Sequence, residues 1–187
     1  MELSAEEELL TARVAWGDET AIRTLIDQHA AWIFSLAFRI SQSRGLARKA
    51  TVEILAQTLR ELEPLRQTRP FRIMAAERLI RFLKHFKIPA PGKLPIDEEL
   101  NLTREISAER KVMFGMILEA LKRLPFEERA TLLLREQGHL PCETIAQILG
   151  QTPTVIRKRL AAVRLKLRES LTVPLERQSP SDGMQRN

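Results

Sequence analysis

The feature that most constrains this 187-residue chain is a helix break at residues 150–153, between an apolar helical run and a long basic one. Gly150 follows the apolar run and can adopt the positive φ that ends a helix. Thr152 offers a hydroxyl N-cap, and Pro153 has the fixed φ that suits a first helical position. The sequence therefore predicts two helices joined by a short turn, the helix-turn-helix pattern.

The second of these predicted helices divides into an apolar and a basic face. At near-helical spacing its apolar positions are Val155, Ile156, Leu160, Val163 and Leu167. Its remaining positions include Arg157, Lys158, Arg159, Arg164, Lys166 and Arg168, with no acid between them. One-sided positive charge after a tight turn favours DNA as the ligand, and a merely solvated helix face is the alternative.

A recognition helix presents its first residues to base edges in the major groove. Thr154, Arg157 and Lys158 are therefore expected to reach bases, whereas Arg159 and Arg164 are expected on phosphates. The predicted DNA-binding residues are Thr152, Thr154, Arg157, Lys158, Arg159 and Arg164.

Composition agrees with a polyanionic ligand. The formal net charge is +6 and the pI is near 10.0, which favours nucleic acid, although basic proteins also bind membranes or acidic partners. The single cysteine, Cys142, excludes an intramolecular disulfide and a multi-cysteine zinc site. Because no apolar stretch reaches the length of a membrane span and the N-terminus is acidic, we expect a cytoplasmic protein.

Catalytic patterns are missing from the sequence. The three histidines, His29, His85 and His139, are far apart, and neither a glycine-rich phosphate loop nor a nucleophile elbow occurs. The pair of His139 and Cys142 cannot by itself fill a structural zinc site. We therefore expect no enzyme activity, no cofactor and no metal ion.

A stretch with three prolines and a glycine divides the chain. Helical periodicity on both sides of it, without strand alternation, predicts an all-α protein of two small helical domains. The expected boundaries are 1–86 and 108–172 for the domains, 87–107 for an extended, mobile linker and 173–187 for a flexible tail.

Four helices are predicted before the linker. Asp18 can cap the second after a break at Gly17, and Gly45 is expected to separate the second from the third. The fourth is expected from about Phe71 to Phe86. The recurring apolar positions of the third are Val52, Leu55, Leu59 and Leu62.

The C-terminal residues resemble the last domain of the extracytoplasmic-function sigma factors of bacteria, members of the sigma-70 family. That domain typically reads LP, LLLR, EIA-x-x-LG, a short turn, V-K-x-R-L and A-R-x-x-LR. The matching residues here are Leu124–Pro125, Leu132–Arg135, Thr144–Ala146 with Leu149–Gly150, Ile156–Leu160, and Val163–Arg164 with Leu167–Arg168. Similar helix-turn-helix domains also occur in response regulators. The N-terminal half must therefore decide whether the chain resembles a sigma factor.

The N-terminal half is similar to the same family at His29, Leu36 and Ala37 and again over Arg78–Lys84. In the family, that second segment melts and holds the −10 promoter element. It is R-L-I-D-Y-L-R there, and Arg81 replaces the aspartate here. The resemblance assigns the −10 element to Arg78, Arg81, Phe82 and Lys84.

The segment Leu46–Ala56 aligns with D-A-E-D-L-V-Q-E-x-F-L, by which the family binds the coiled-coil clamp of RNA polymerase. The resemblance therefore assigns polymerase binding to Arg48, Lys49 and Glu53. Of the family's acids only Glu53 remains. Arg48 and Lys49 replace paired carboxylates, which turns an attractive contact with a basic partner surface into a repulsive one.

The resemblance implies a sigma factor, a DNA-binding transcription initiation factor that directs RNA polymerase core to specific promoters. Its implied partners are promoter DNA, the polymerase core and an anti-sigma factor. One alternative is a sigma-like transcription regulator that binds DNA without activating polymerase, which the basic residues Arg48, Lys49 and Arg81 motivate. Another is a protein-interaction module that binds an anti-sigma factor; salt-sensitive duplex binding by the C-terminal half would argue against it.

Overall fold

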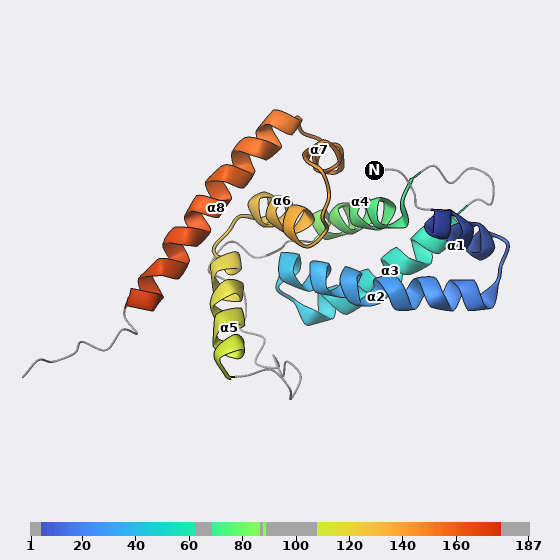
Figure 1. Ribbon diagram of the computed structural model, residues 1–187, viewed down its shortest axis with the longest axis horizontal. Coiled ribbons are helices and arrows are strands. Elements are labelled where there is room, and N and C mark those ends of the chain that lie inside the picture. Colours follow the sequence, from blue (N-terminus) through green and yellow to red (C-terminus); the bar gives the residue numbers. More distant parts are fainter. Residues whose placement is uncertain (1–4, 63–68, 87, 89–107, 177–187) are drawn as a thin grey trace, which may run out of the picture.

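The computed structural model describes residues 5–62, 69–86, 88 and 108–176. The predicted linker, apart from Ile88, and the chain after residue 176 lie outside this part. All regular structure in the described part is helical, as expected, and no strand occurs there (Figure 1). The helices are α1 (Ala5–Ala15), α2 (Glu19–Ser41), α3 (Arg44–Arg60), α4 (Phe71–Lys84), α5 (Ala108–Lys122), α6 (Phe126–Glu136), α7 (Cys142–Leu149) and α8 (Pro153–Glu176).

The start of α2 follows the prediction. Gly17 has a positive φ of 81°, and the Asp18 carboxylate accepts hydrogen bonds from the backbone N–H groups of Thr20 and Ala21, at 2.9 and 3.1 Å. These bonds, that from Ala21 first, and the Arg13 side chain lower the pKa of Asp18 below its ordinary value. The residues next to this helix start were therefore sufficient to predict the N-cap of α2.

The break between α2 and α3 does not lie at Gly45, as predicted, because Gly45 is inside α3. Gln42 takes the left-handed conformation instead, with φ 57°, and its N–H donates to Phe38 O at 2.6 Å. Ser43 then caps α3 by accepting the Leu46 N–H at 3.3 Å. A side-chain cap and a C-terminal backbone bond are sufficient to end and restart a helix, so glycine is not needed there.

Two further details of the N-terminal half differ from the prediction. Val52 is 71% exposed, because the buried face of α3 follows Ala47, Ala50 and Ile54. The last residues of α4 tighten into a turn, in which the N–H of Phe86 donates to Leu83 O at 3.1 Å, so the helix ends at Lys84.

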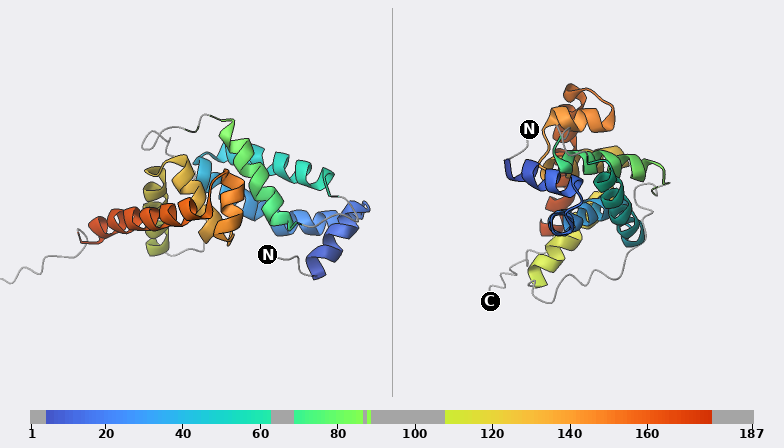
Figure 2. Two further views of the ribbon diagram at one scale, coloured as in Figure 1. Left: turned by 90° about the horizontal axis from the view of Figure 1, so that it is seen from above. Right: turned by 90° about the vertical axis from the view of Figure 1, so that its right-hand side faces the viewer.

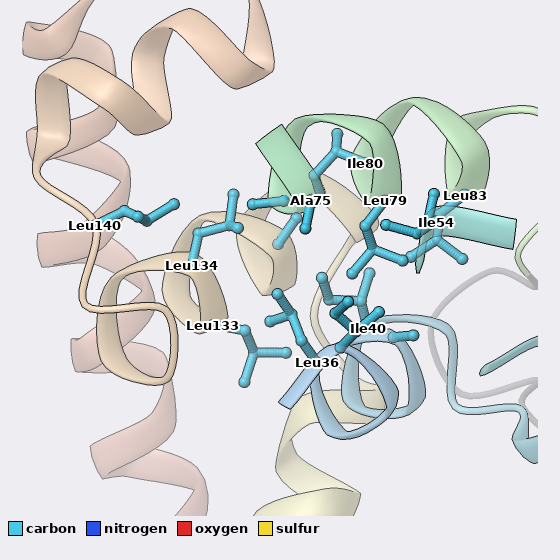
Figure 3. Close-up of a cluster of buried hydrophobic side chains, with 14 of the residues drawn as sticks. Leu36, Ile40, Ile54, Ala75, Leu79, Ile80, Leu83, Leu133, Leu134 and Leu140 are labelled. Atoms are coloured by element: carbon cyan, nitrogen blue, oxygen red, sulfur yellow. The ribbon is translucent and has the colours of Figure 1, made fainter. Parts of the chain in front are cut away.

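The N-terminal and C-terminal helices pack against each other, α2 on α6 and α4 on α7 (Figures 1 and 2). Figure 3 shows apolar side chains from both halves meeting, among them Leu36 on α2 and Leu133 on α6. Trp32 Nε1 donates to Gln137 O at 3.3 Å, and the Arg72 guanidinium lies 5.0 Å from the Trp32 ring centroid. The two predicted domains thus share one buried apolar cluster in this structure.

Three described side chains carry buried polar atoms without hydrogen-bond partners: His29, Arg129 and, at Oε1, Gln137. His29 stacks on Phe71 with ring centroids 4.7 Å apart, and its Nδ1 is unpartnered. Burial, with a smaller contribution from the charge of Arg72, lowers the pKa of His29 to about 4. Arg129 on α6 is 1% exposed with Nε and Nη1 unpartnered, and burial lowers its pKa to about 10.

The last helix runs further than the predicted domain boundary. The sequence places a flexible tail from residue 173, whereas α8 continues to Glu176. Pro174 lies in the last turn of α8 and does not end the helix.

Candidate nucleic-acid interface

The turn between α7 and α8 forms as the sequence predicts. Gly150 has φ 68°, its N–H donates to Gln147 O at 3.3 Å, and the Gln151 N–H donates to Ala146 O at 2.8 Å. This pair of bonds is the Schellman motif, which satisfies the last carbonyls of a helix. The Thr152 hydroxyl then accepts the Val155 N–H at 3.4 Å, and α8 begins at Pro153.

The preceding turn, between α6 and α7, depends on a glycine that the sequence interpretation did not single out. A Cβ at Gly138 would lie 2.5 Å from the Leu134 carbonyl oxygen. His139 follows with φ 53°, and Leu140 is fully buried. Because only glycine allows this close approach, Gly138 sets the angle at which α7 leaves α6.

The first residues of α8 form an exposed surface. Thr152, Thr154, Arg157 and Lys158 are all exposed, as a recognition helix requires. Val155 is 41% exposed among them, so its predicted place in the core is wrong. The buried face of α8 instead follows Ile156, Leu160 and Val163, which leaves position 155 on the outer side.

Arg157 and Lys158 differ in their surroundings. Arg157 Nη1 lies 3.0 Å from Glu143 Oε1 on α7, and both side chains are more than half exposed. An exposed ion pair contributes about 0–1 kcal/mol, so the guanidinium can exchange Glu143 for a ligand at little cost. Lys158 has no ion pair within the described residues.

Arg159 does not lie where a phosphate contact was expected. Its side chain is 17% exposed and reaches α6, where Nη2 lies 3.0 Å from Glu127 Oε2. It also donates to Gln151 Oε1 at 2.9 Å and to Thr131 Oγ1 at 3.2 Å. With its donors turned inward, Arg159 holds α8 and the turn against α6 in this structure.

Further along α8, acids of α6 pair with the basic face. Arg164 lies 2.6 Å from Glu136, and Lys166 lies 2.6 Å from Glu128, measured between the charged nitrogen and oxygen atoms. These acids are distant in sequence, so inspection of α8 alone does not reveal them. Among these paired cations of α8, Arg159 is therefore the least accessible to a ligand, whereas Arg164 and Lys166 are about as exposed as Arg157.

The four residues assigned to the −10 element do not form one surface. The Arg78 side chain is 12% exposed and pairs with Glu61, and Phe82 packs against Phe86 with ring centroids 4.9 Å apart. Arg81 and Lys84 are exposed and line a cleft of about 290 Å³ between α4 and α7, whose other wall is residues 147–150. Only Arg81 and Lys84 are thus brought together, next to the helix-turn-helix.

The residues assigned to polymerase binding lie on α3. Arg48 and Lys49 are exposed, and Lys49 Nζ lies 5.4 Å from the Phe86 ring centroid. Glu53 is half-buried and accepts a hydrogen bond from Gln57 Nε2 at 2.6 Å. The exposed part of this segment is accordingly basic.

The described residues contain neither a candidate metal cluster nor a candidate membrane-spanning helix. No cluster of three or more His, Cys, Asp or Glu side chains there could hold a metal ion. None of the described helices has both the length and the apolar composition that crossing a bilayer requires.

Comparison with known proteins identifies the C-terminal helices. No curated protein matches the chain in sequence. The structure is similar to that of CnrH in complex with the cytosolic domain of CnrY, with a TM-score of 0.66 and 17% identity over 89% of this chain and 97% of that one. Residues 114–167 match the family described as Sigma-70, region 4. The helix-turn-helix of this chain is therefore part of a sigma-70 region 4 domain.

Proposed function

We propose that the chain is a sigma factor, a DNA-binding transcription initiation factor that directs RNA polymerase core to specific promoters. The observation that carries this is the exposed start of α8, with Thr154, Arg157 and Lys158, on a sigma-70 region 4 domain. In a helix-turn-helix this part of the second helix enters the major groove. The helices of residues 108–172 then bind the upstream, −35, promoter element.

The side chains at the start of α8 suit different groups of a DNA duplex, both on the bases and on the backbone. Arg157 can donate two hydrogen bonds to a guanine, and Lys158 supplies positive charge close to the phosphates. Val155, exposed in the first turn of α8, suits the methyl group of a thymine. Arg164 can exchange Glu136 for a phosphate, because their ion pair is more than half exposed.

For the N-terminal half, residues 1–86, we propose the polymerase-binding and −10-binding role. Support comes from the likeness to CnrH, which covers 89% of this chain and so extends well beyond the region 4 domain. Arg81 and Lys84 on α4 are exposed cations suited to the −10 element. By extension from the complex of CnrH with the cytosolic domain of CnrY, a protein regulator of the anti-sigma type is a further proposed partner.

A second function is favoured by one observation. Arg48 and Lys49 are exposed on α3, where the resembling family carries acids for the polymerase clamp. Like charges across an interface disfavour binding. A regulator that reads DNA but does not activate polymerase is therefore the alternative.

The DNA-reading role is tested by selecting duplexes from a randomised pool with the full chain and then measuring affinity. Arg157→Ala should weaken binding about 5–150-fold and relax base preference at one position. Lys158→Ala should weaken binding similarly across sequences and reduce the salt dependence. Lys166→Ala, on the same helix but outside the residues predicted to contact DNA, is the matched control. Unchanged affinity in both test variants would exclude a recognition surface here.

The polymerase-binding role needs a separate experiment. The full chain is incubated with purified bacterial RNA polymerase core at physiological salt, and the complex is assayed for transcription from a selected duplex. Retention and transcription would support the sigma factor. Duplex binding without retention, with retention restored by Arg48→Glu/Lys49→Asp, would favour the regulator.

A further inference from the structure

The first half of α3 presents an exposed face with positive charge around an apolar residue. Arg48 and Lys49 are exposed, and Val52, one turn further along from Arg48, is 71% exposed. Gly45 is exposed too, and a Cβ added there would meet no atom within 4 Å. These four residues form what we call the α3 basic face. The face is open, so another molecule can approach it closely.

The charge of the α3 basic face is not neutralised within the described residues. No salt bridge there involves Arg48 or Lys49. The one acid of α3, Glu53, is instead hydrogen-bonded to Gln57 Nε2. Arg164 on α8, by contrast, has an acidic partner at 2.6 Å. The α3 basic face therefore attracts an external negative charge.

The ring of Phe86 lies beside this face. Its surroundings help to decide whether the attracted negative charge belongs to a nucleic acid or to a protein. Unpaired bases bind by stacking on an accessible aromatic ring. Phe86 is 37% exposed, but Lys49 Nζ lies 5.4 Å from its centroid and the Phe82 ring packs on it at 4.9 Å. Both contacts occupy the ring, and the cation–π contact also positions Lys49. Phe86 is thus a poor platform for a base.

The exposure of Val52 also favours a protein over a nucleic acid as the ligand of this face. Phosphate binding requires hydrogen-bond donors and positive charge, to which an exposed valine adds nothing. Protein interfaces, in contrast, combine an apolar centre with a polar or charged rim. An exposed valine flanked by Arg48 and Lys49 has this arrangement.

We propose that the α3 basic face is a docking site for an acidic surface of another protein, with an apolar side chain of that partner against Val52. Charge complementarity with Arg48 and Lys49 selects the partner and accelerates the encounter. A basic partner surface is disfavoured for the same reason. Docking on α3 does not require duplex binding by α8, so the failure of one in experiment leaves the other standing.

The test maps backbone amide resonances of the isotope-labelled full chain by NMR. The probes are an amphipathic peptide of glutamate and leucine, poly-L-glutamate and a short oligothymidylate. The amphipathic peptide is expected to shift the amides of Gly45, Arg48, Lys49 and Val52 more than either other probe does. Shifts on α8 do not count, because that helix is also basic.

Two variants test whether charge and the valine both contribute. R48E/K49E is expected to weaken binding of the amphipathic peptide at this face about tenfold or more. R23E/R60E, which reverses two other exposed arginines and changes the net charge equally, is the control and should retain the affinity. V52S should weaken binding of the amphipathic peptide at this face but leave binding of poly-L-glutamate unchanged. Circular dichroism verifies that each variant keeps its helices.

Three results would overturn the proposal. The oligothymidylate could shift the α3 basic face more than the peptide does, which would assign the face to nucleic acid. A second such result is that none of the probes shifts the amides of the α3 basic face, which would mean that the face is not a docking site. Finally, D97N/E98Q/E99Q could move the Gly45 and Val52 amides without any probe, which would mean that acids of the chain itself occupy the face.

Discussion

The two basic helices α8 and α3 use their cations differently. On α8, three cations after the first turns, Arg159, Arg164 and Lys166, are paired with acids of α6. On α3, Arg48 and Lys49 have no such partners in the described residues. A basic run in a sequence therefore does not by itself define a ligand surface, because the neighbouring helices decide how much of its charge stays available.

The two halves of the chain also share buried apolar residues. Leu36 on α2 is fully buried, and Figure 3 shows it beside Leu133 of α6. If this cluster couples the halves, damage on one side must destabilise both.

Leu36→Ala should lower the free energy of unfolding by about 2–5 kcal/mol, since it leaves a cavity in a packed interior. Because the cluster spans both halves, α2 and α8 should unfold in one transition. Urea denaturation followed by circular dichroism, with amide exchange to resolve the helices, measures this. Leu9→Ala, at a side chain that is 64% exposed, is the control and should change stability by less than about 0.5 kcal/mol. Two separate transitions, only one of them shifted, would show that the halves are independent.

His29 should make stability fall as the pH falls from about 6.5 towards 4. Its pKa is lowered to about 4 in the folded chain from an ordinary value of 6.5, so the unfolded chain binds the proton more tightly. This contribution to the free energy of unfolding is complete above pH 6.5 and is lost on acidification. Because the ring is only half-buried, solvent screening reduces it to about 1–2 kcal/mol. Urea denaturation at several pH values measures it.

His29→Phe is the matched variant for this prediction, because it keeps a ring against Phe71 and removes the titrating group. The pH dependence between 6.5 and 4 should become shallower in the variant. An unchanged slope would assign the dependence to other groups, such as the carboxylates.

Glycine-to-alanine substitutions should change the free energy of unfolding in opposite directions in the turn before α8 and in α3. Gly150→Ala should destabilise by about 1–2 kcal/mol, because φ 68° is strained for any residue with a Cβ. Gly45→Ala, inside α3 with open space around it, should stabilise by up to about 0.5–1 kcal/mol. Thermal denaturation compares the two. A gain in stability from Gly150→Ala would contradict the Schellman geometry of the turn.

The helix-turn-helix was predictable because its signals are local. Gly150, Thr152 and Pro153 act through backbone conformation and hydrogen bonds within a few residues, and the structure confirms each of them. Asp18 is predictable for the same reason. The all-α class follows from periodicity, which is also a local property.

Errors arose where the orientation of a helix mattered. Val155 and Val52 fit an apolar helical pattern in the sequence, yet both are exposed. A pattern with several apolar positions per turn leaves the direction of the buried face uncertain by one residue, and only the neighbouring helices determine it. The roles in DNA and polymerase binding remain predictions for the experiments above.

The sequence by itself determined the helices, the turn between α7 and α8 and the excess of positive charge, because each depends on residues close together in the chain. Only the tertiary structure decided which cations are available to a ligand. Glu127 is 32 positions from Arg159 in the numbering, yet their charged atoms lie 3.0 Å apart. Such pairs form when packing brings distant helices together. The pair of Arg159 is held against α6 with the arginine 17% exposed, whereas the pair of Arg157 with Glu143 stays more than half exposed.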